Sequence, residues 1–248
     1  MTTPASHPQP YAESAFESAI ETDLLASGWH RYGGTYDAAL ALDTSEVATF
    51  VGTTQNDAWE RLRSSYGGDR NTTQREFNKR LAREIDQRGA LDVLRHGVKD
   101  RGVTIDLAYF RPGHTLAANA LDEYHANRLT VARQLHYSPR DPSKSLDLTL
   151  FLNGIPIATV ELKSPLTAQR WTVEDAKRQY REDRDPNELL FARRALVHFA
   201  VDPDLVFLTT RLAGPRTRFL PFNVGSHGPG QSGGAGNPPA GNPASPTP

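Results

Sequence analysis

The segment 145–163 constrains the fold most, because it has the pattern of a β-hairpin that carries charges inside its apolar arms. The arms flank Asn153-Gly154, a dipeptide typical of a two-residue hairpin turn. Asp147, Glu161 and Lys163 interrupt the apolar residues. A charged side chain in a buried strand pair is costly unless it is paired or holds a metal ion. These three charges are therefore candidates for a functional site.

An Asp…Glu-x-Lys pattern is the active-site signature of a large class of metal-dependent nucleases. Cutting a phosphodiester requires a hard cation, an activated water and stabilisation of the developing charge. Asp147 and Glu161 offer the oxygen ligands that Mg²⁺ prefers, and the main-chain carbonyl of Leu162 can supply a third. Lys163 would orient or deprotonate the water, or neutralise the charge of the transition state. The pattern predicts a Mg²⁺ site formed by Asp147, Glu161 and Leu162, with Lys163 as a catalytic residue beside it.

Strand parity tests this prediction. Glu161 and Lys163 are two residues apart and share one face of a strand. A strict two-residue turn at Asn153-Gly154 would pair Asp147 with residue 160 and place it on the wrong face. The nuclease hypothesis therefore requires a loop of odd length or a β-bulge in the hairpin. The alternative is an ordinary amphipathic hairpin whose carboxylates lie at a solvated edge, with Lys163 paired to one of them.

Periodicity places helices before strands, which predicts an α/β (α+β) domain with a mixed sheet and an N-terminal helical part. Ser14-Ala-Phe-Glu17 reads as a capping box at the start of the first helix. A helix is expected at about 172–184, opened by Thr172. Because its basic residues, including Arg184, alternate with acidic ones, we expect a solvated, ion-paired surface there. Glu17 and Glu21 could supply a further acid to the site, but exposed surface roles are favoured.

The hairpin and the segments after it resemble the N-terminal nuclease domain of the restriction (R) subunit of type I restriction–modification enzymes. The resembling strings run in the family's order from about residue 12 to 237, and they are Ser145-Leu-Asp-Leu-Thr-Leu-Phe-Leu-Asn-Gly-Ile-Pro, Val160-Glu-Leu-Lys-Ser-Pro-Leu-Thr, Ala176-Lys-Arg-Gln-Tyr-Arg and Leu196-Val-His-Phe-Ala-Val-Asp-Pro-Asp.

The resemblance implies a PD-(D/E)xK restriction-endonuclease core that is Mg²⁺-dependent and cuts double-stranded DNA. It assigns Asp147, Glu161 and Lys163 as the catalytic acid, acid and lysine, and Gln179 as a supporting residue on the following helix. Without the resemblance, the alternative for Gln179 is a solvated residue on the surface of the helix. The implied partners are the modification and specificity subunits of a type I complex, which would supply sequence specificity.

One departure concerns the motor. The family's R subunits continue into an ATP-dependent translocase, but this sequence has no G-x-x-x-x-G-K-[ST] phosphate loop. We expect a split, truncated or excised piece, with ATP needed only by a motor fragment that would act in trans. The rival hypothesis is an inactive remnant that serves only as a subunit-docking or DNA-binding module.

Composition sets the remaining limits. The net charge is −1, so any affinity for DNA must come from a local patch or from a partner. No signal peptide or membrane-spanning run is visible, so a cytoplasmic protein is expected. The proposed boundaries are a disordered N-terminus at 1–11, a nuclease domain at 12–224, and a Gly/Pro-rich disordered tail or truncated linker at 225–248.

Overall fold

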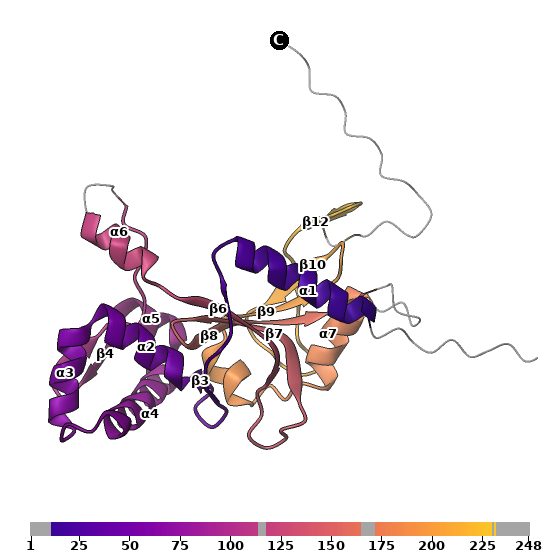
Figure 1. Cartoon of the computed structure of the whole chain (residues 1–248). Coiled ribbons are helices and arrows are strands. Elements are labelled where there is room, and N and C mark those ends of the chain that lie inside the picture. The colour runs from indigo at the N-terminus through magenta and orange to yellow at the C-terminus, as the bar shows by residue number, and fades with distance from the viewer. Residues whose placement is uncertain (1–10, 114–117, 165–171, 230, 232–248) are drawn as a thin grey trace, which may run out of the picture.

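A seven-stranded mixed sheet forms the centre of the computed structural model, which describes residues 11–113, 118–164, 172–229 and 231 (Figure 1). The strand order is β1-β6-β7-β8-β9-β10-β11. The strands of this sheet are β1 (His30–Arg31), β6 (Leu129–His136), β7 (Ser145–Leu152), β8 (Ile155–Leu162), β9 (Val197–Val201), β10 (Val206–Thr209) and β11 (Leu220–Pro221).

The directions of the strands follow from their connections. β6, β7 and β8 are joined by short loops and pair antiparallel, as hairpins require. β8 pairs parallel with β9, and the crossover between them contains the helix α7 (Val173–Glu182). β1 also pairs parallel with β6, at the edge of the sheet. The predicted mixed sheet flanked by helices is confirmed.

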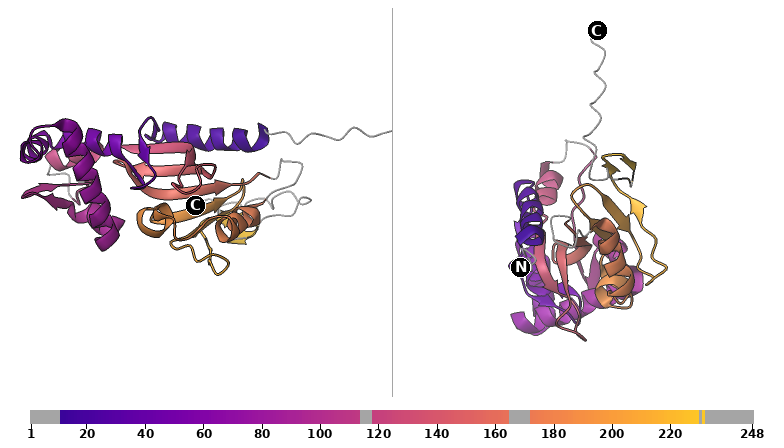
Figure 2. Two further views of the ribbon diagram at one scale, coloured as in Figure 1. Left: turned by 90° about the horizontal axis from the view of Figure 1, so that it is seen from below. Right: turned by 90° about the vertical axis from the view of Figure 1, so that its right-hand side faces the viewer.

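Helix α1 (Tyr11–Ala26) covers one face of the sheet (Figure 2). Its partly buried Phe16, Ile20 and Leu24 share an apolar cluster with the buried side chains of Leu148 and Leu162. The helix begins at Tyr11, so Ser14 lies inside it and the predicted capping box is wrong.

Helix α7 covers the opposite face (Figure 2). Thr172 caps it as predicted, since its side chain accepts the N–H of Glu174 while the Asp175 carboxylate accepts the N–H of Thr172. Buried Val173 and Ala176 pack with Phe207 of β10. A single π-helical turn, η1 (Leu190–Arg194), follows on the same side and leads into β9.

A helical lobe lies beside the sheet, and its apolar core around Phe50, Phe77 and Ile85 continues into the sheet at Ile155 of β8 (Figure 1). Asp69 caps the longest helix of this lobe, because its side chain accepts the N–H of Thr72. The elements of this lobe are α2 (Thr44–Thr54), α3 (Asn56–Ser65), α4 (Arg70–Arg88), α5 (Ala90–His96), β4 (Val98–Asp100) and β5 (Val103–Ile105).

Short elements complete the described structure, and they are β2 (Tyr36–Asp37), β3 (Leu42–Asp43), α6 (Ala118–His125), β12 (Val224–Gly225) and β13 (Gly228–Pro229). The pairing of β12 with β13 carries regular structure past the proposed boundary at residue 225. Residues 1–10 and 232–248, on which the two disorder predictions mostly fall, lie outside the described residues. No helix in the described ranges is long and apolar enough to cross a membrane.

Candidate active site

A β-bulge in β8 brings Asp147 into register with Glu161. The turn has two residues, Asn153 and Gly154, and φ is positive at both, at 52° and 84°. Leu152 pairs with Ile155 and Phe151 with Pro156, but the register then shifts, so that Leu150 pairs with Ala158 and Leu148 with Val160. The same register, continued by one residue, sets Asp147 opposite Glu161.

The cause of the bulge is visible in the sequence of β8. Pro156 has no N–H to donate to β7, and proline within a sheet is confined to edges and bulges. Ile157 becomes the extra residue, and its carbonyl accepts the N–H of Leu196 instead, at 2.9 Å. The prediction that the hairpin must contain an odd loop or a bulge is thus confirmed by the bulge.

Asp147 is held at the end of the sheet by main-chain and side-chain donors. Its Oδ2 accepts the N–H of Leu162 at 2.7 Å, and its Oδ1 accepts Nε2 of Gln134 at 3.2 Å. The first bond fixes the carboxylate beside the Glu161-Leu162 peptide. The carbonyl of Leu162, the predicted third ligand, belongs to the last residue of β8.

Glu161 is fully buried and forms an ion pair with Arg184, just past the end of α7. Nε and one terminal nitrogen of Arg184 lie 2.7 and 2.6 Å from Glu161 Oε1, and the same terminal nitrogen donates to the carbonyl of Ser145 at 2.9 Å. The second oxygen, Oε2, is buried without a hydrogen-bond partner among the described residues. Burial raises the pKa of Glu161 to about 8, and the nearby Asp147 charge adds to the rise, whereas Arg184 and Lys163 oppose it.

The expectation of a solvated surface is wrong for Arg184, which is only 7% exposed. Sequence alternation failed here because Arg184 lies beyond the last turn of α7 and points at the buried carboxylate. Its pKa is raised, since the Glu161 carboxylate outweighs the cost of burial.

Lys163 follows the last residue of β8, and its main-chain N–H donates to Val201 of β9 at 2.9 Å. Its ammonium lies near enough to Glu161 to lower the pKa of that carboxyl. The side chain is half-exposed, so it can meet a ligand at the mouth of the site.

Gln179 is half-buried on α7, and its side chain makes no hydrogen bond to another described residue. The structure therefore does not join it to Asp147 or Glu161. Its main-chain carbonyl accepts the N–H of Arg184 at 3.2 Å, which helps to set the direction of the chain at that arginine.

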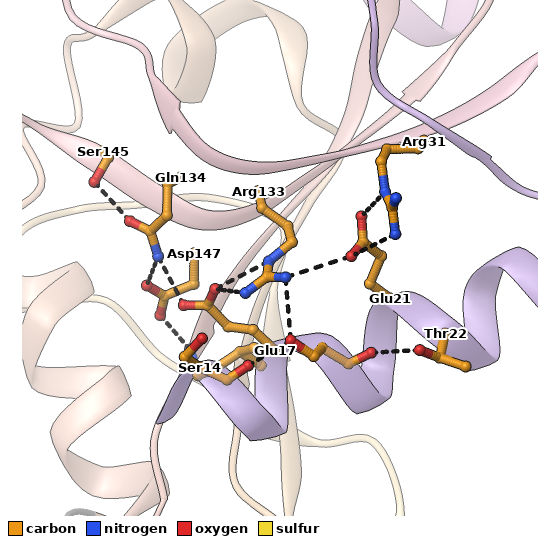
Figure 3. A network of polar contacts seen from close by, with 11 residues as sticks. Ser14, Glu17, Glu21, Thr22, Arg31, Arg133, Gln134, Ser145 and Asp147 are labelled. Carbon is orange, nitrogen blue, oxygen red and sulfur yellow. Dashed lines mark hydrogen bonds and ion pairs between the residues drawn. The ribbon is translucent and has the colours of Figure 1, made fainter. Parts of the chain in front are cut away.

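A second polar network connects Asp147 to helix α1 (Figure 3). The Nε2 group of Gln134 donates both to Asp147 and to Glu17 Oε1, the latter at 2.7 Å. Arg133 binds Glu17 at 2.9 Å and Glu21 at 3.4 Å. Both glutamates are 5% exposed, so the favoured expectation of exposed surface roles is wrong for them.

Gln134 has a backbone conformation that is unusual for a strand, with φ of +48°. A residue other than glycine with a left-handed backbone conformation costs on the order of 1–2 kcal/mol relative to the same residue in the usual β conformation. The strain coincides with the position opposite Asp147, where the Gln134 amide links two carboxylates. Sequence reasoning missed this residue, because no motif marks a glutamine in β6.

The donor set fits a magnesium ion only if the ion keeps most of its ligands from outside the protein. Among the described residues no group of three or more His, Asp or Glu side chains could hold a metal ion. Mg²⁺ commonly binds one or two carboxylates together with water and phosphate oxygens. Asp147, the uncommitted Oε2 of Glu161 and the Leu162 carbonyl match that requirement.

A comparison with known families identifies the family of the chain. The chain matches the model of the family described as "Type I restriction enzyme R protein N terminus" over residues 10–216. The chain belongs to this family. The match includes the whole candidate site, from Glu17 to Arg184. No curated protein matches the chain.

Proposed function

We propose that this domain of a type I restriction enzyme R subunit is a Mg²⁺-dependent endonuclease that hydrolyses phosphodiester bonds of double-stranded DNA. The observation that carries the proposal is the bulge that sets Asp147 opposite Glu161. Two surface charges without a function would not need to face each other across the hairpin. They would also not leave a buried carboxylate oxygen, Glu161 Oε2, without a hydrogen-bond partner among the described residues.

The side chains divide the work as follows. Asp147 and Glu161, with the Leu162 carbonyl, would hold Mg²⁺, which supplies Lewis-acid polarisation of the phosphate. Arg184 keeps Glu161 oriented through the bonds to Oε1 and leaves Oε2 available. Lys163 would place its ammonium where negative charge develops, or move a proton of the attacking water. Gln179 remains a supporting residue in the proposal, without a contact of its side chain to the carboxylates.

In the cell we expect the domain to act in the cytoplasm, within a complex that includes modification and specificity subunits. Those partners would choose the DNA sequence, and a motor in the same enzyme, or supplied in trans, would use ATP. The family supports membership of a type I complex, and the remaining partners are part of the proposal.

A nicking assay tests the proposed activity. The wild-type chain should convert supercoiled plasmid to open circles in Mg²⁺ but not in EDTA, and Lys163→Ala should abolish the conversion. Lys99→Ala is a matched control, because Lys99 is an exposed strand lysine on β4, in the helical lobe. Equal inactivity of wild type and Lys163→Ala, with both proteins folded, would reject catalysis by this chain.

One observation favours a second candidate, a docking module for other subunits. Leu220 and Phe222, in and next to the edge strand β11, are 64% and 63% exposed, and Val224 of the following strand β12 is 74% exposed. Exposed apolar groups at a sheet edge are typical of an interface. This function is compatible with cutting, and it becomes the main one if the nicking assay fails.

A further inference from the structure

A cleft of about 900 Å³ lies between the helical lobe and the sheet, away from the proposed active site. One wall is the turn Gly89-Ala90 between α4 and α5, the second is the segment 191–196 around η1, and the third is the loop after β10. The main-chain N–H of Leu196, in the second wall, donates to the carbonyl of Ile157 in β8. Glu161 is four residues further along that strand, a separation of about 13 Å.

The charge of this cleft is one-sided. Its lining includes Arg193, Arg194, Arg211 and Arg216, and no acidic residue is among the described residues that line it. The chain as a whole has 28 basic and 29 acidic residues, so this grouping departs from the average surface. Arg194 is paired with Asp86, so three like charges remain, and like charges around a concave surface focus a positive potential.

Three of these arginines have no acidic partner among the described residues. Arg193, Arg211 and Arg216 are exposed, and none forms a salt bridge with a residue that the structure describes. Elsewhere the fold commonly pairs its arginines, as in Arg80 with Glu84 and Arg140 with Asp185. Their guanidinium groups are therefore available to an anion that enters the cleft.

Both arginine-bearing walls are fixed by buried polar contacts. Arg194 is fully buried and ties η1 to the helical lobe, because it donates to the carbonyl of Leu40 at 2.9 Å and to Asp86 at 2.6 Å. Thr217 ties the other wall, since its hydroxyl accepts the N–H of Ala213 at 2.9 Å and donates to Gly214 at 2.7 Å. Fixed walls reduce the entropy cost of binding.

We propose that this cleft is a binding site for a phosphate group, held by Arg193, Arg211 and Arg216. Arginine presents a planar set of donors that matches phosphate oxygens in pairs, and several arginines favour the multiple charge of phosphate over a single carboxylate. The phosphate can belong to the backbone of a polynucleotide or to a small phosphate-bearing molecule. The site is independent of the proposed nuclease chemistry, because it uses none of its residues.

The test is an NMR titration of the full chain with sodium phosphate, without Mg²⁺ and at constant ionic strength. Main-chain amides of residues 193–196 and 210–213 should shift in wild type. In the double variant Arg211→Ala, Arg216→Ala the dissociation constant should rise about tenfold or more, since hydrogen bonds to charged groups are the strong ones. The control is Arg61→Ala, Arg95→Ala, which removes the same charge from exposed positions in the helical lobe.

A second arm identifies the source of the phosphate, with a 20-base-pair duplex in the same buffer. If DNA occupies the cleft, the double variant should reduce the slope of log Kd against log salt by about 1–2 relative to the control. If the double variant loses phosphate binding while its DNA binding matches the control, the ligand is a small phosphate-bearing molecule.

The proposal is overturned if phosphate shifts no amide in the cleft, or if the double variant and the control respond alike. Equal melting temperatures of the two variants would show that a loss of binding is not a loss of folding. Because the titration contains no Mg²⁺ and measures no cutting, its outcome is separate from that of the nicking assay.

Discussion

At the turn end of the β7–β8 hairpin, both polar atoms of the buried Asn153 side chain have partners, whereas at the open end Glu161 Oε2 has none in the described structure. Asn153 accepts the N–H of Arg128 at 2.7 Å and donates to Leu107 and Asn127 at 2.9 Å. Both side chains are fully buried. Under the proposed function, the difference separates a polar residue that shapes the fold from one whose free oxygen would bind a metal ion.

The largest effect is expected at the open end. Asp147→Asn should lower the rate of plasmid nicking by about a thousandfold, the size found when a group that acts on transition-state charge is lost. The unfolding free energy should fall by only about 1 kcal/mol, because the asparagine oxygen can still accept the N–H of Leu162, while its NH2 group loses the bond from Gln134 Nε2. Nicking rate and urea denaturation measure the two quantities. A variant that cuts normally would show that this end of the hairpin is also merely structural.

The turn end should behave in the opposite way. Asn153→Ala should reduce the unfolding free energy by about 4 kcal/mol, since buried partners lose their bonds and φ of +52° strains alanine. Cutting per folded molecule should stay the same. Asn153→Gly is the matched control, because it loses the same bonds but tolerates the positive φ, so its loss should be about 1 kcal/mol smaller. If folded Asn153→Ala cuts more slowly than wild type, the turn end of the hairpin also contributes to cutting and the two ends do not differ in this respect.

Between the two ends, Thr159 pairs with buried His198 of β9, whose Nδ1 lies 2.8 Å from the Thr159 hydroxyl. Burial lowers the pKa of His198 to about 4. The unfolded chain then binds more protons between about pH 6.5 and 4, so stability is lost as the pH falls through this window. The contribution is about 3 kcal/mol, at 1.36 kcal/mol per pKa unit.

His198→Gln isolates this contribution. The wild-type protein should lose about 3 kcal/mol more unfolding free energy than the variant between pH 7 and pH 4, as measured by urea denaturation. Identical pH dependence of the two proteins would mean that His198 titrates normally in the fold.

The smallest effect is expected at Gln134, which supports Asp147 from the side of α1. Gln134→Ala removes one hydrogen bond to that carboxylate, worth about 1 kcal/mol, so nicking at saturating Mg²⁺ should slow about fivefold. Gln74→Ala on α4 is the control, since it also removes a hydrogen-bonded glutamine side chain, whose Nε2 donates to the Thr44 carbonyl, far from the site. Equal rates for Gln134→Ala and the control would remove Gln134 from the site.

Sequence reasoning succeeded where local patterns carry the information. The hairpin, its charges and the need for a bulge follow from alternation and the Asn153-Gly154 turn, and the mixed sheet follows from the order of helices and strands. The position of the bulge was also available in principle, because Pro156 cannot donate to β7. The α7 cap at Thr172 was equally local.

The misses involve partners that are distant in the sequence. Arg184 looked like one charge in an ion-paired helix, and only the fold shows that Glu161 lies beside it. Glu17 looked exposed, because its partner Arg133 is more than a hundred residues away. Glu21 shares that partner and also binds Arg31, which is ten residues away but beyond the end of the helix. The buried, polar face of α1 thus has no signature in its own periodicity.

The covering of the sheet by α1 has a consequence for the order of folding. The helix leaves the ribosome well before the strand residues that it covers, up to Leu162, are made. At about 5–20 residues per second, roughly ten seconds pass before the sheet can receive it. A lone helix of 16 residues is marginal in water, so α1 should dock as a late step. Because Glu17 is part of that helix, the hydrogen-bonded link from Glu17 through Gln134 to Asp147 would form only when α1 docks on the sheet.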